Sequence, residues 1–309
     1  MNETTEGLHF ASLPPALAPL VPDLFVLSQY ILPKRALTVL MGALARAEAG
    51  AVTTAAIRWF VRHYRVDMNE AADPDVASYK TFNEFFTRAL RPGARPVEAA
   101  DLICPIDGAI SQFGRIERDQ IFQAKGHRYS TAALLAGDAA LARQFEDGEF
   151  VTLYLSPKDY HRIHMPCDGR LTRMTYVPGD LFSVNPATAR GVPGLFARNE
   201  RVVCMFEGPR GPFAMVLVGA TIVGSMATVW HGVVNPPRRP DVHTWRYDDR
   251  PMVLRRGEEM GRFLLGSTVV MLFPKDCMRF RADWAPERLV RMGEAMASYL
   301  TPGPTVLPG

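Results

Sequence analysis

The pattern of hydrophobic positions changes once along the chain, close to residue 95. Before that point, apolar residues recur every three or four positions in residues 34–46 and again in residues 56–64, a spacing typical of amphipathic helices. The two stripes consist of Leu37, Leu40, Met41 and Leu44, and then Ile57, Phe60, Val61 and Tyr64. A further helix is predicted over residues 81–90, before the helix-ending Arg91-Pro92-Gly93.

After residue 96 the apolar runs are short and are separated by glycine and proline, which predicts strands. The runs cover residues 108–110, 151–155, 171–177, 202–206, 213–218 and 263–273. Helical insertions are predicted near residues 130–145 and over residues 286–300 at the end.

These patterns predict an α+β fold in which amphipathic N-terminal helices precede a β-rich core. Residues 1–23 contain four prolines and are expected to form a loosely ordered leader. Residues 24–95 form the helical region, and residues 96–309 form the core. Residues 211–230 carry no charge, but their glycines, proline and β-branched residues favour two buried strands over a membrane-spanning helix.

The composition also shows that one region of the chain is locally basic. The 309 residues are 48% hydrophobic and 22% charged, as in a globular protein, and the net charge of +3 is too small to indicate nucleic-acid binding. Between residues 28 and 65, however, six basic residues accompany one acidic residue, Glu48, so the helical region is locally basic. The first seven residues lack the basic and apolar segments of a secretory signal, so we expect none.

The four cysteines show no Cys-x-x-Cys spacing. Because a chain of this size does not need disulfides for stability, we expect Cys104, Cys167, Cys204 and Cys277 to be reduced thiols in a cytoplasmic setting. We expect no metal site.

The candidate chemistry centres on a serine that follows a glycine. Gly266-Ser267 lies in an apolar, β-branched run, and a serine hydroxyl becomes a nucleophile only when a base takes its proton. Two histidines, His161 and His164, stand three positions apart and are candidate bases. The Gly-Ser pair alone would be interpreted as part of a buried strand, and the histidines alone as a half-buried pair or two metal ligands.

Several separated motifs, taken together, indicate a protein family. They are Pro105-Ile-Asp-Gly-Ala-Ile-Ser-Gln112, Leu155-Ser-Pro-Lys-Asp-Tyr-His-Arg-Ile-His-Met-Pro-Cys-Asp-Gly169, Gly194-Leu-Phe-Ala-Arg-Asn-Glu-Arg201, Val218-Gly-Ala-Thr-Ile-Val-Gly-Ser225 and Gly266-Ser267-Thr268. In this order, from about residue 27 to about residue 273, the sequence resembles the phosphatidylserine decarboxylases of the bacterial and mitochondrial type.

The resemblance implies a precursor that cleaves itself between Gly266 and Ser267. The matching charge-relay residues are Asp107, His164 and Ser267, in which His164 accepts the hydroxyl proton and Asp107 holds the imidazole. The products are a large chain of residues 1–266 and a small chain of residues 267–309, with Ser267 converted into a covalent pyruvoyl group. This cofactor forms a Schiff base with phosphatidylserine and releases carbon dioxide to give phosphatidylethanolamine, without a metal.

The sequence assigns roles to the remaining site residues less specifically. The resemblance assigns His161 to decarboxylation and protonation of the product. Ser183 and Asn185 follow a Pro-Gly turn and either line the head-group pocket or form a surface Asn-Pro turn. Glu258, Glu259 and Arg262 precede the cleavage run and either fix the backbone of the junction or are solvated charges, and we favour the second interpretation.

The substrate lies in a bilayer, so the partners follow from the resemblance and from the basic helices. The apolar stripes can enter the acyl boundary while Lys34, Arg35, Arg46, Arg58 and Arg62 meet an anionic membrane surface, although such stripes more often pack on a core. We expect a peripheral protein on the cytoplasmic face of the cell membrane, and a dimer of the two-chain unit. No nucleic-acid partner is expected.

Two other function classes stay open at this point. One is a serine hydrolase that uses Ser267 or Ser225 on an external substrate, although no Gly-x-Ser-x-Gly motif surrounds either residue. The other is a non-catalytic module that binds anionic lipid. Both predict an uncleaved chain.

Overall fold

The computed structural model describes residues 21–221, 225–249, 251–264 and 268–300. The described helices are α1 (Val21–Ile31), α2 (Lys34–Arg46), α3 (Ala51–Tyr64), α4 (Phe82–Phe86), α5 (Thr131–Leu134), α6 (Ala139–Ala142), α7 (Pro186–Gly191) and α8 (Leu195–Arg198), with 3₁₀ turns at Met68–Glu70 and Arg143–Phe145. The helices predicted over residues 34–46 and 56–64 are confirmed as α2 and α3, whereas the helix predicted over residues 81–90 is the shorter α4. Helix α1 begins at Val21, within the residues expected to form the leader.

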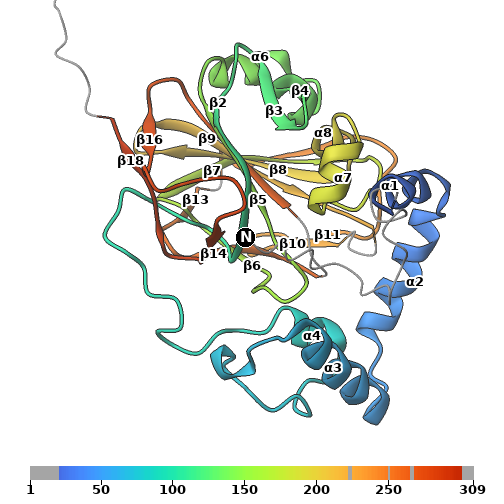
Figure 1. Ribbon diagram of the computed structural model, residues 1–309. Coiled ribbons are helices and arrows are strands. Elements are labelled where there is room, and N and C mark those ends of the chain that lie inside the picture. Colours follow the sequence, from blue (N-terminus) through green and yellow to red (C-terminus); the bar gives the residue numbers. More distant parts are fainter. Residues whose placement is uncertain (1–20, 222–224, 250, 265–267, 301–309) are drawn as a thin grey trace, which may run out of the picture.

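A local sequence signal explains where helix α4 begins. Thr81 caps α4 in a capping box with Glu84, in which each side chain bonds the other residue's backbone N–H. Figure 1 shows α1 beside α7 on the body of the protein, α3 and α4 as a separate group below it, and α2 running between them.

The strands lie in four sheets within the described residues. The largest has the order β12-β7-β8-β9-β15-β5-β2-β17, with β13 also paired to β7, and a second sheet has the order β11-β10-β14-β6. The other two are β1-β18-β16 and β3-β4. Their bounds are β1 (Leu102–Ile103), β2 (Gly108–Arg115), β3 (Gln120–Ala124), β4 (His127–Ser130), β5 (Glu149–Tyr154), β6 (Arg162–His164), β7 (Gly169–Val177), β8 (Arg201–Gly208), β9 (Gly211–Val218), β10 (Met226–Thr228), β11 (Gly232–Asn235), β12 (His243–Arg246), β13 (Met252–Leu254), β14 (Glu259–Phe263), β15 (Thr268–Phe273), β16 (Met278–Phe280), β17 (Leu289–Val290) and β18 (Ala295–Tyr299).

Two of the predicted elements differ from the structure. The helix predicted over residues 286–300 is wrong: this segment forms β17 and β18, because Glu287 (φ +69°) and Gly293 (φ +92°) adopt left-handed conformations that interrupt a helix. The apolar run of residues 263–273 is two strands, since β14 and β15 belong to different sheets. The two strands predicted within residues 211–230 are confirmed as β9 and β10.

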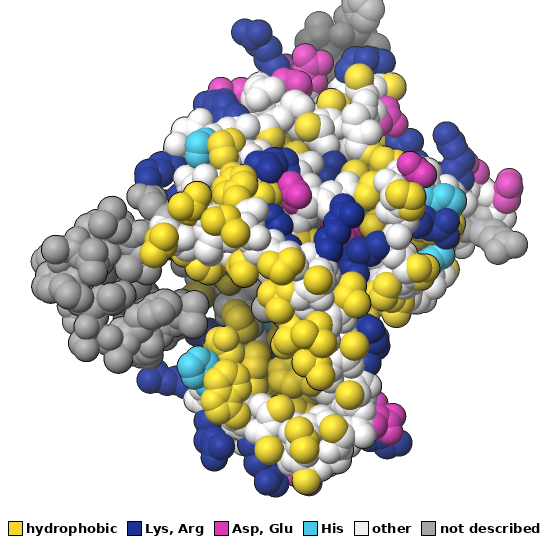
Figure 2. Space-filling view, turned by 90° about the vertical axis from the view of Figure 1, so that its right-hand side faces the viewer, with side chains coloured by type: hydrophobic (Ala, Val, Ile, Leu, Met, Phe, Trp, Pro, Cys, Tyr) yellow, Lys and Arg dark blue, Asp and Glu magenta, His cyan; other side chains and the backbone are white. Residues whose placement is uncertain are grey.

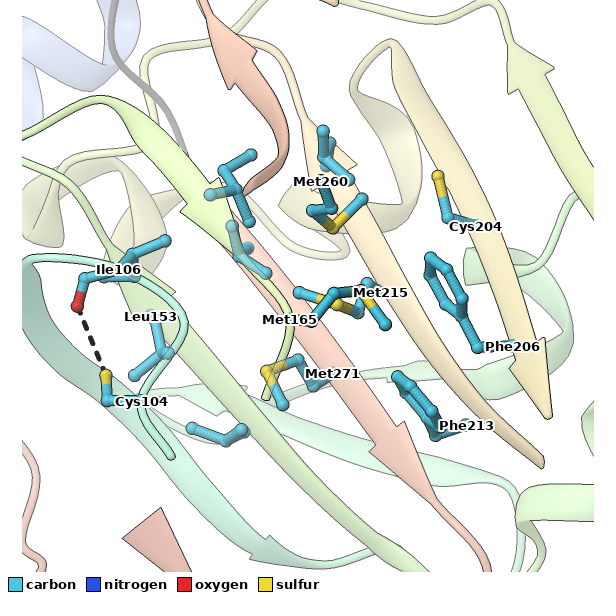
Figure 3. Packing of buried hydrophobic residues seen from close by; sticks show 14 of the residues in the cluster. Cys104, Ile106, Leu153, Met165, Cys204, Phe206, Phe213, Met215, Met260 and Met271 are labelled. Carbon is cyan, nitrogen blue, oxygen red and sulfur yellow. Dashed lines mark hydrogen bonds between the residues drawn. The ribbon is translucent and has the colours of Figure 1, made fainter. Parts of the chain in front are cut away.

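The core is filled by apolar side chains from both large sheets. All six residues of β15 are buried, as expected for a strand paired on both edges and covered on both faces. Figure 3 shows Met165, Met215 and Met271 lying together in this core. Cys104 donates a weak hydrogen bond to the carbonyl of Ile106, and the four cysteines are free thiols.

Candidate active site

The predicted cleavage junction, Gly266-Ser267, lies outside the described residues, but both of its flanks are held by sheet contacts. On the N-terminal side, the N–H of Phe263 donates to the carbonyl of His161 at 3.0 Å, and the N–H of Leu264 donates to the carbonyl of Ser225 at 3.0 Å. On the C-terminal side, Thr268 begins β15. Strands β14 and β15, which belong to different sheets, therefore flank the junction in the sequence, and β14 is hydrogen-bonded to His161.

Strand β6 begins directly after His161 and ends at His164, so it brings the two histidines to this place in different surroundings. It pairs antiparallel with β14, which sets His164 opposite Glu259. The His161 ring stacks on Phe86 of α4, with centroids 4.0 Å apart and planes 19° apart, whereas His164 lies beside Tyr160 and Gly257. The two side chains are therefore placed for separate tasks.

Both ring nitrogens of His164 have partners. Nδ1 lies 2.8 Å from the carbonyl oxygen of Gly257, which can only accept, so Nδ1 carries the proton. Nε2 lies 3.0 Å from the hydroxyl of Tyr160 and accepts from it. Burial lowers the pKa of His164 below its ordinary value, more than the contact with Gly257 raises it. His164 is thus a neutral imidazole whose Nε2 can act as a base.

Asp107, the predicted third member of the relay, is engaged elsewhere. Both of its carboxylate oxygens accept from Nε of Arg95 at 2.9 Å, and Oδ1 also accepts the N–H of Met292 at 2.9 Å. Arg95 also pairs with Glu70 at 2.6 Å. The segment of Asp107 does lie next to His164, because the N–H of His164 donates to the carbonyl of Pro105 at 2.9 Å. In the described structure, the group that orients the His164 ring is the Gly257 carbonyl.

His161 is fully buried, and neither ring nitrogen has a hydrogen-bond partner in the described part of the chain. Burial lowers its pKa to about 3, and the positive charge of Arg88 adds to this effect, while the nearby backbone of Ser156 and Pro157 opposes it. Buried polar groups without partners are rare in native proteins. This uncharged imidazole, which has no partner among the described residues, is therefore suited to exchange a proton with a bound molecule.

The charges before the junction are structural and are not simply solvated. Glu259 pairs with Arg162 at 2.9 Å and with Arg262 at 2.6 Å, and Arg162 also donates to the carbonyl of Thr87 at 2.8 Å. The interpretation of Glu259 and Arg262 as solvated charges is therefore wrong. These ion pairs tie β6 and β14 to the end of α4.

The two weakly predicted pocket residues lie in another part of the fold. The Asn185 side chain caps α7 by accepting from the N–H and hydroxyl of Thr188, both at 2.9 Å. The N–H of Ser183 donates to the side chain of Gln29 in α1 at 3.1 Å. This arrangement favours the turn interpretation for Asn185.

The predicted membrane stripes on α2 and α3 behave differently. The α3 stripe packs against α4, where Ile57 and Phe85 are fully buried. Helix α2 instead buries its small residues Thr38, Gly42 and Ala45. It leaves Leu40 and Leu44 more than half exposed, at 56% and 57%.

These exposed side chains belong to what we call the α1–α2 apolar face. Its members are Leu24, Leu27, Tyr30, Ile31, Val39, Leu40 and Leu44, each at least half exposed. Figure 2 shows the side of the molecule with α1 and α2, on which hydrophobic side chains gather with lysines and arginines around them. Within the described residues, no single helix has the length and hydropathy to cross a bilayer, although α1 and α2 together meet that test as a pair bent by 86°.

Comparison with known proteins decides the family. The family model described as phosphatidylserine decarboxylase matches residues 82–298, and a model described as PSD matches residues 24–65. The chain belongs to the phosphatidylserine decarboxylase family. It is 70% identical over 278 residues to the phosphatidylserine decarboxylase proenzyme of Azoarcus sp. (strain BH72), which covers 90% of this chain and 96% of that one.

Two other similar proteins carry the same name. The proenzyme of Methylibium petroleiphilum is 72% identical over 272 residues, covering 88% of this chain and 96% of the relative. That of Polaromonas sp. (strain JS666) is 72% identical over 277 residues, covering 89% and 98%. The predicted family and the enzyme class, a decarboxylase and hence a carboxy-lyase, are confirmed.

Sequence reasoning missed the residues that support the two histidines. Tyr160 adjoins His161 in the quoted motif, but its contact with His164 depends on the local chain path. Gly257 lies in an Arg-Arg-Gly-Glu turn with φ +83°, and Arg95 is separated from Asp107 by twelve positions. No motif or periodicity connects these residues to the site before the fold is known. Among the described residues, His, Cys, Asp and Glu side chains form no group of three or more that could hold a metal ion.

Proposed function

We propose that this chain cleaves itself between Gly266 and Ser267 and then converts phosphatidylserine to phosphatidylethanolamine. The observation that carries the proposal is the pair of buried, differently placed histidines at the two ends of residues 161–164, where His161 accepts a backbone hydrogen bond from Phe263 of β14, the strand before the junction. The family and the proenzyme names of the relatives support the same activity.

In the first reaction, His164 serves as the general base. The Ser267 hydroxyl oxygen attacks the carbonyl carbon of Gly266 while Nε2 of His164 takes the hydroxyl proton. The C–N bond between the two residues breaks, the proton passes to the leaving nitrogen, and an ester remains. Gly257 supports this role because its carbonyl keeps the proton of the neutral ring on Nδ1.

Asp107 contributes at longer range. Its negative charge favours the imidazolium that forms during the attack, and its bonds to Arg95 and Met292 hold the segment that carries Pro105 against His164. We propose Asp107, His164 and Ser267 as the cleavage residues, with the Gly257 carbonyl as the group that orients the base. Elimination of the ester and loss of ammonia then leave a pyruvoyl group at position 267.

The surroundings of the junction fit such a group, because His161 offers two unpartnered ring nitrogens in a fully buried position. When bound to substrate, the pyruvoyl group supplies the electron sink for the pair left by departing carbon dioxide. His161 holds a neutral ring on Phe86, and this ring can take the proton that the substrate ammonium gives up and return it to the carbon that lost the carboxylate.

We also propose that the α1–α2 apolar face rests on the membrane that holds the substrate. Seven exposed apolar side chains on two consecutive helices support this, because such a surface is unfavourable in water and gains free energy in the acyl boundary. Arg35 and Arg46 are exposed at the two ends of α2 and can meet anionic head groups. The free thiols support a location on the cytoplasmic side.

Three measurements test the proposal. The mass of the denatured protein should reveal two chains, residues 1–266 and residues 267–309, the second blocked at its first residue. The purified protein should release carbon dioxide from phosphatidylserine, and its mass under native conditions should correspond to a dimer of the two-chain unit. A single 34.3 kDa chain that hydrolyses esters, or one that binds anionic vesicles without releasing carbon dioxide, would favour the two alternative classes.

A further inference from the structure

Arg88 is a buried cation whose hydrogen-bonding capacity is not filled. It lies two residues after α4 and is only 5% exposed. Its Nη2 donates to the carbonyl of Lys158 at 3.4 Å, and its Nε has no partner in the described part of the chain. A buried guanidinium without full pairing is costly, so such a group is expected where an anion binds.

The carboxylates around Arg88 are already engaged with other groups. Glu70 and Asp107 both pair with Arg95, and Asp159 accepts from the N–H and hydroxyl of Ser156 at 2.7 Å. No carboxylate of the described residues forms an ion pair with Arg88. These carboxylates thus act on the cation only at a distance, and its Nε has no partner among the described residues.

The position of Arg88 relative to His161 is fixed by three consecutive residues. Phe86 stacks on the His161 ring, Thr87 accepts from Arg162, and Arg88 donates to Lys158. The end of α4 therefore lies along residues 158–162 and places the Arg88 charge close enough to His161 to act on its ring. The Arg88 donor and the His161 nitrogens that lack partners among the described residues therefore belong to two chain segments that lie in contact.

We propose that Arg88 binds the phosphodiester oxyanion of the phosphatidylserine head group, while His161 acts on the carbon that loses carbon dioxide. This assignment rests on the proposed function. The phosphorus is only a few covalent bonds from that carbon, so a molecule bound at His161 reaches a neighbouring cation. A guanidinium matches a phosphate through paired donors.

The substrate offers a second anion, its carboxylate, but the chemistry favours the phosphate. The carboxylate loses its charge as carbon dioxide leaves, so a cation paired with it stabilises the substrate more than the transition state and slows the reaction. The phosphate keeps its charge throughout. A cation there improves binding equally in both states, which lowers KM without changing kcat.

The test compares Arg88→Met and Arg88→Lys with Arg91→Met, an exposed arginine on the same segment. All three proteins are expected to be processed into two chains. In detergent micelles with phosphatidylserine, Arg88→Met should raise KM at least about tenfold with kcat nearly unchanged, Arg88→Lys should raise it less, and Arg91→Met should match the wild type. Inhibition by glycerophosphoethanolamine, which has the phosphate and lacks the carboxylate, should weaken by a similar factor.

A substrate without phosphate shows whether Arg88 binds the phosphate or the carboxylate. With O-dodecylserine, which keeps the amine and carboxylate, the wild type and Arg88→Met should have equal kcat/KM. An equal loss on both substrates would assign Arg88 to the carboxylate and overturn the proposal, as would an unchanged KM for phosphatidylserine. If Arg88→Met is not processed, the KM and inhibition values of Arg88→Lys decide in the same way. A processed wild type that releases no carbon dioxide from phosphatidylserine would refute the proposed function itself.

Discussion

The carbonyl oxygen of Gly257 accepts the Nδ1–H of His164 at 2.8 Å, and Gly257 presents it from a left-handed conformation with φ +83°. A glycine adopts this conformation without strain, whereas a residue with a Cβ does not. The identity of residue 257 is therefore connected to the orientation of the proposed base. This relationship leads to the first prediction.

Gly257→Ala should slow self-cleavage and lower the free energy of unfolding by about 1–2 kcal/mol. The new Cβ would lie 3.1 Å from Val97, so the turn must shift and carry the carbonyl away from His164. Gly93→Ala is the matched control, because Gly93 has φ +79° and nothing within 4 Å of an added Cβ. A time course of precursor cleavage measures both. Equal cleavage rates in the two variants would contradict the role of Gly257.

The pH dependence of self-cleavage should report the state of His164. The base must be neutral, and burial lowers its pKa, so the rate should stay constant as the pH falls and decline only below the ordinary histidine value of about 6.5. Tyr160→Phe removes a hydrogen bond to the neutral ring and should move this decline to higher pH. Cleavage of a precursor made by cell-free synthesis gives the profile. A decline centred above pH 6.5 in the wild type would exclude the buried neutral base.

His161→Ala and His161→Phe should both be processed into two chains but should release carbon dioxide at least about 100-fold more slowly. The phenylalanine variant preserves a ring on Phe86 and so separates packing from proton transfer. His127→Ala, on β4, serves as the control. Failure of processing in both His161 variants would show that the two histidines have been assigned to the wrong reactions.

His161 should also make stability depend on pH. Its pKa is about 3 in the folded protein and about 6.5 in an unfolded chain, so below pH 6.5 the unfolded state binds a proton that the folded state does not. The free energy of unfolding should therefore fall as the pH is lowered from 6.5 toward 3, by up to about 1.4 kcal/mol per pH unit from this group. Urea unfolding at several pH values should show a flatter curve for His161→Phe. Equal slopes of the unfolding free energy against pH for the wild type and His161→Phe would refute the lowered pKa of His161.

The double variant Leu40→Glu with Leu44→Glu should weaken binding to anionic vesicles by about tenfold or more for each leucine, because the acyl boundary no longer gains their burial. Leu289→Glu changes a leucine on β17 that is even more exposed, at 73%, and lies outside the α1–α2 apolar face, so this variant should bind as the wild type does. Co-sedimentation with vesicles measures the difference. Equal binding of both proteins would remove the membrane role of this face.

Periodicity predicted most of the fold because the helices and strands follow their intrinsic patterns. It failed over residues 286–300, where Glu287 and Gly293 break a helical pattern through backbone conformations that a sequence does not display. Periodicity also predicted one apolar run where β14 and β15 are two strands. Both are apolar, and only their pairing with different sheets distinguishes them.

For the site, the motifs identified His161 and His164 but left the geometry of the pair open, and the structure places His161 directly before β6 and His164 at its end. They could not give the partners of these residues. Gly257 reaches His164 across 93 positions and Arg88 lies near His161 across 73, and such contacts depend on the path of the whole chain. The small buried residues of α2 were likewise hidden by its more obvious leucines, so periodicity identified an apolar stripe but not the side that packs.

The place of β15 bears on how the protein can be made. This strand belongs to the proposed small chain, yet it fills the gap between β9 and β5 with paired backbone on both edges. The precursor closes that gap by folding within one molecule, whereas the separated chains would have to find each other in solution. Once denatured, the mature enzyme should therefore recover only at a rate that depends on its concentration, while the uncut Ser267→Ala protein refolds independently of dilution.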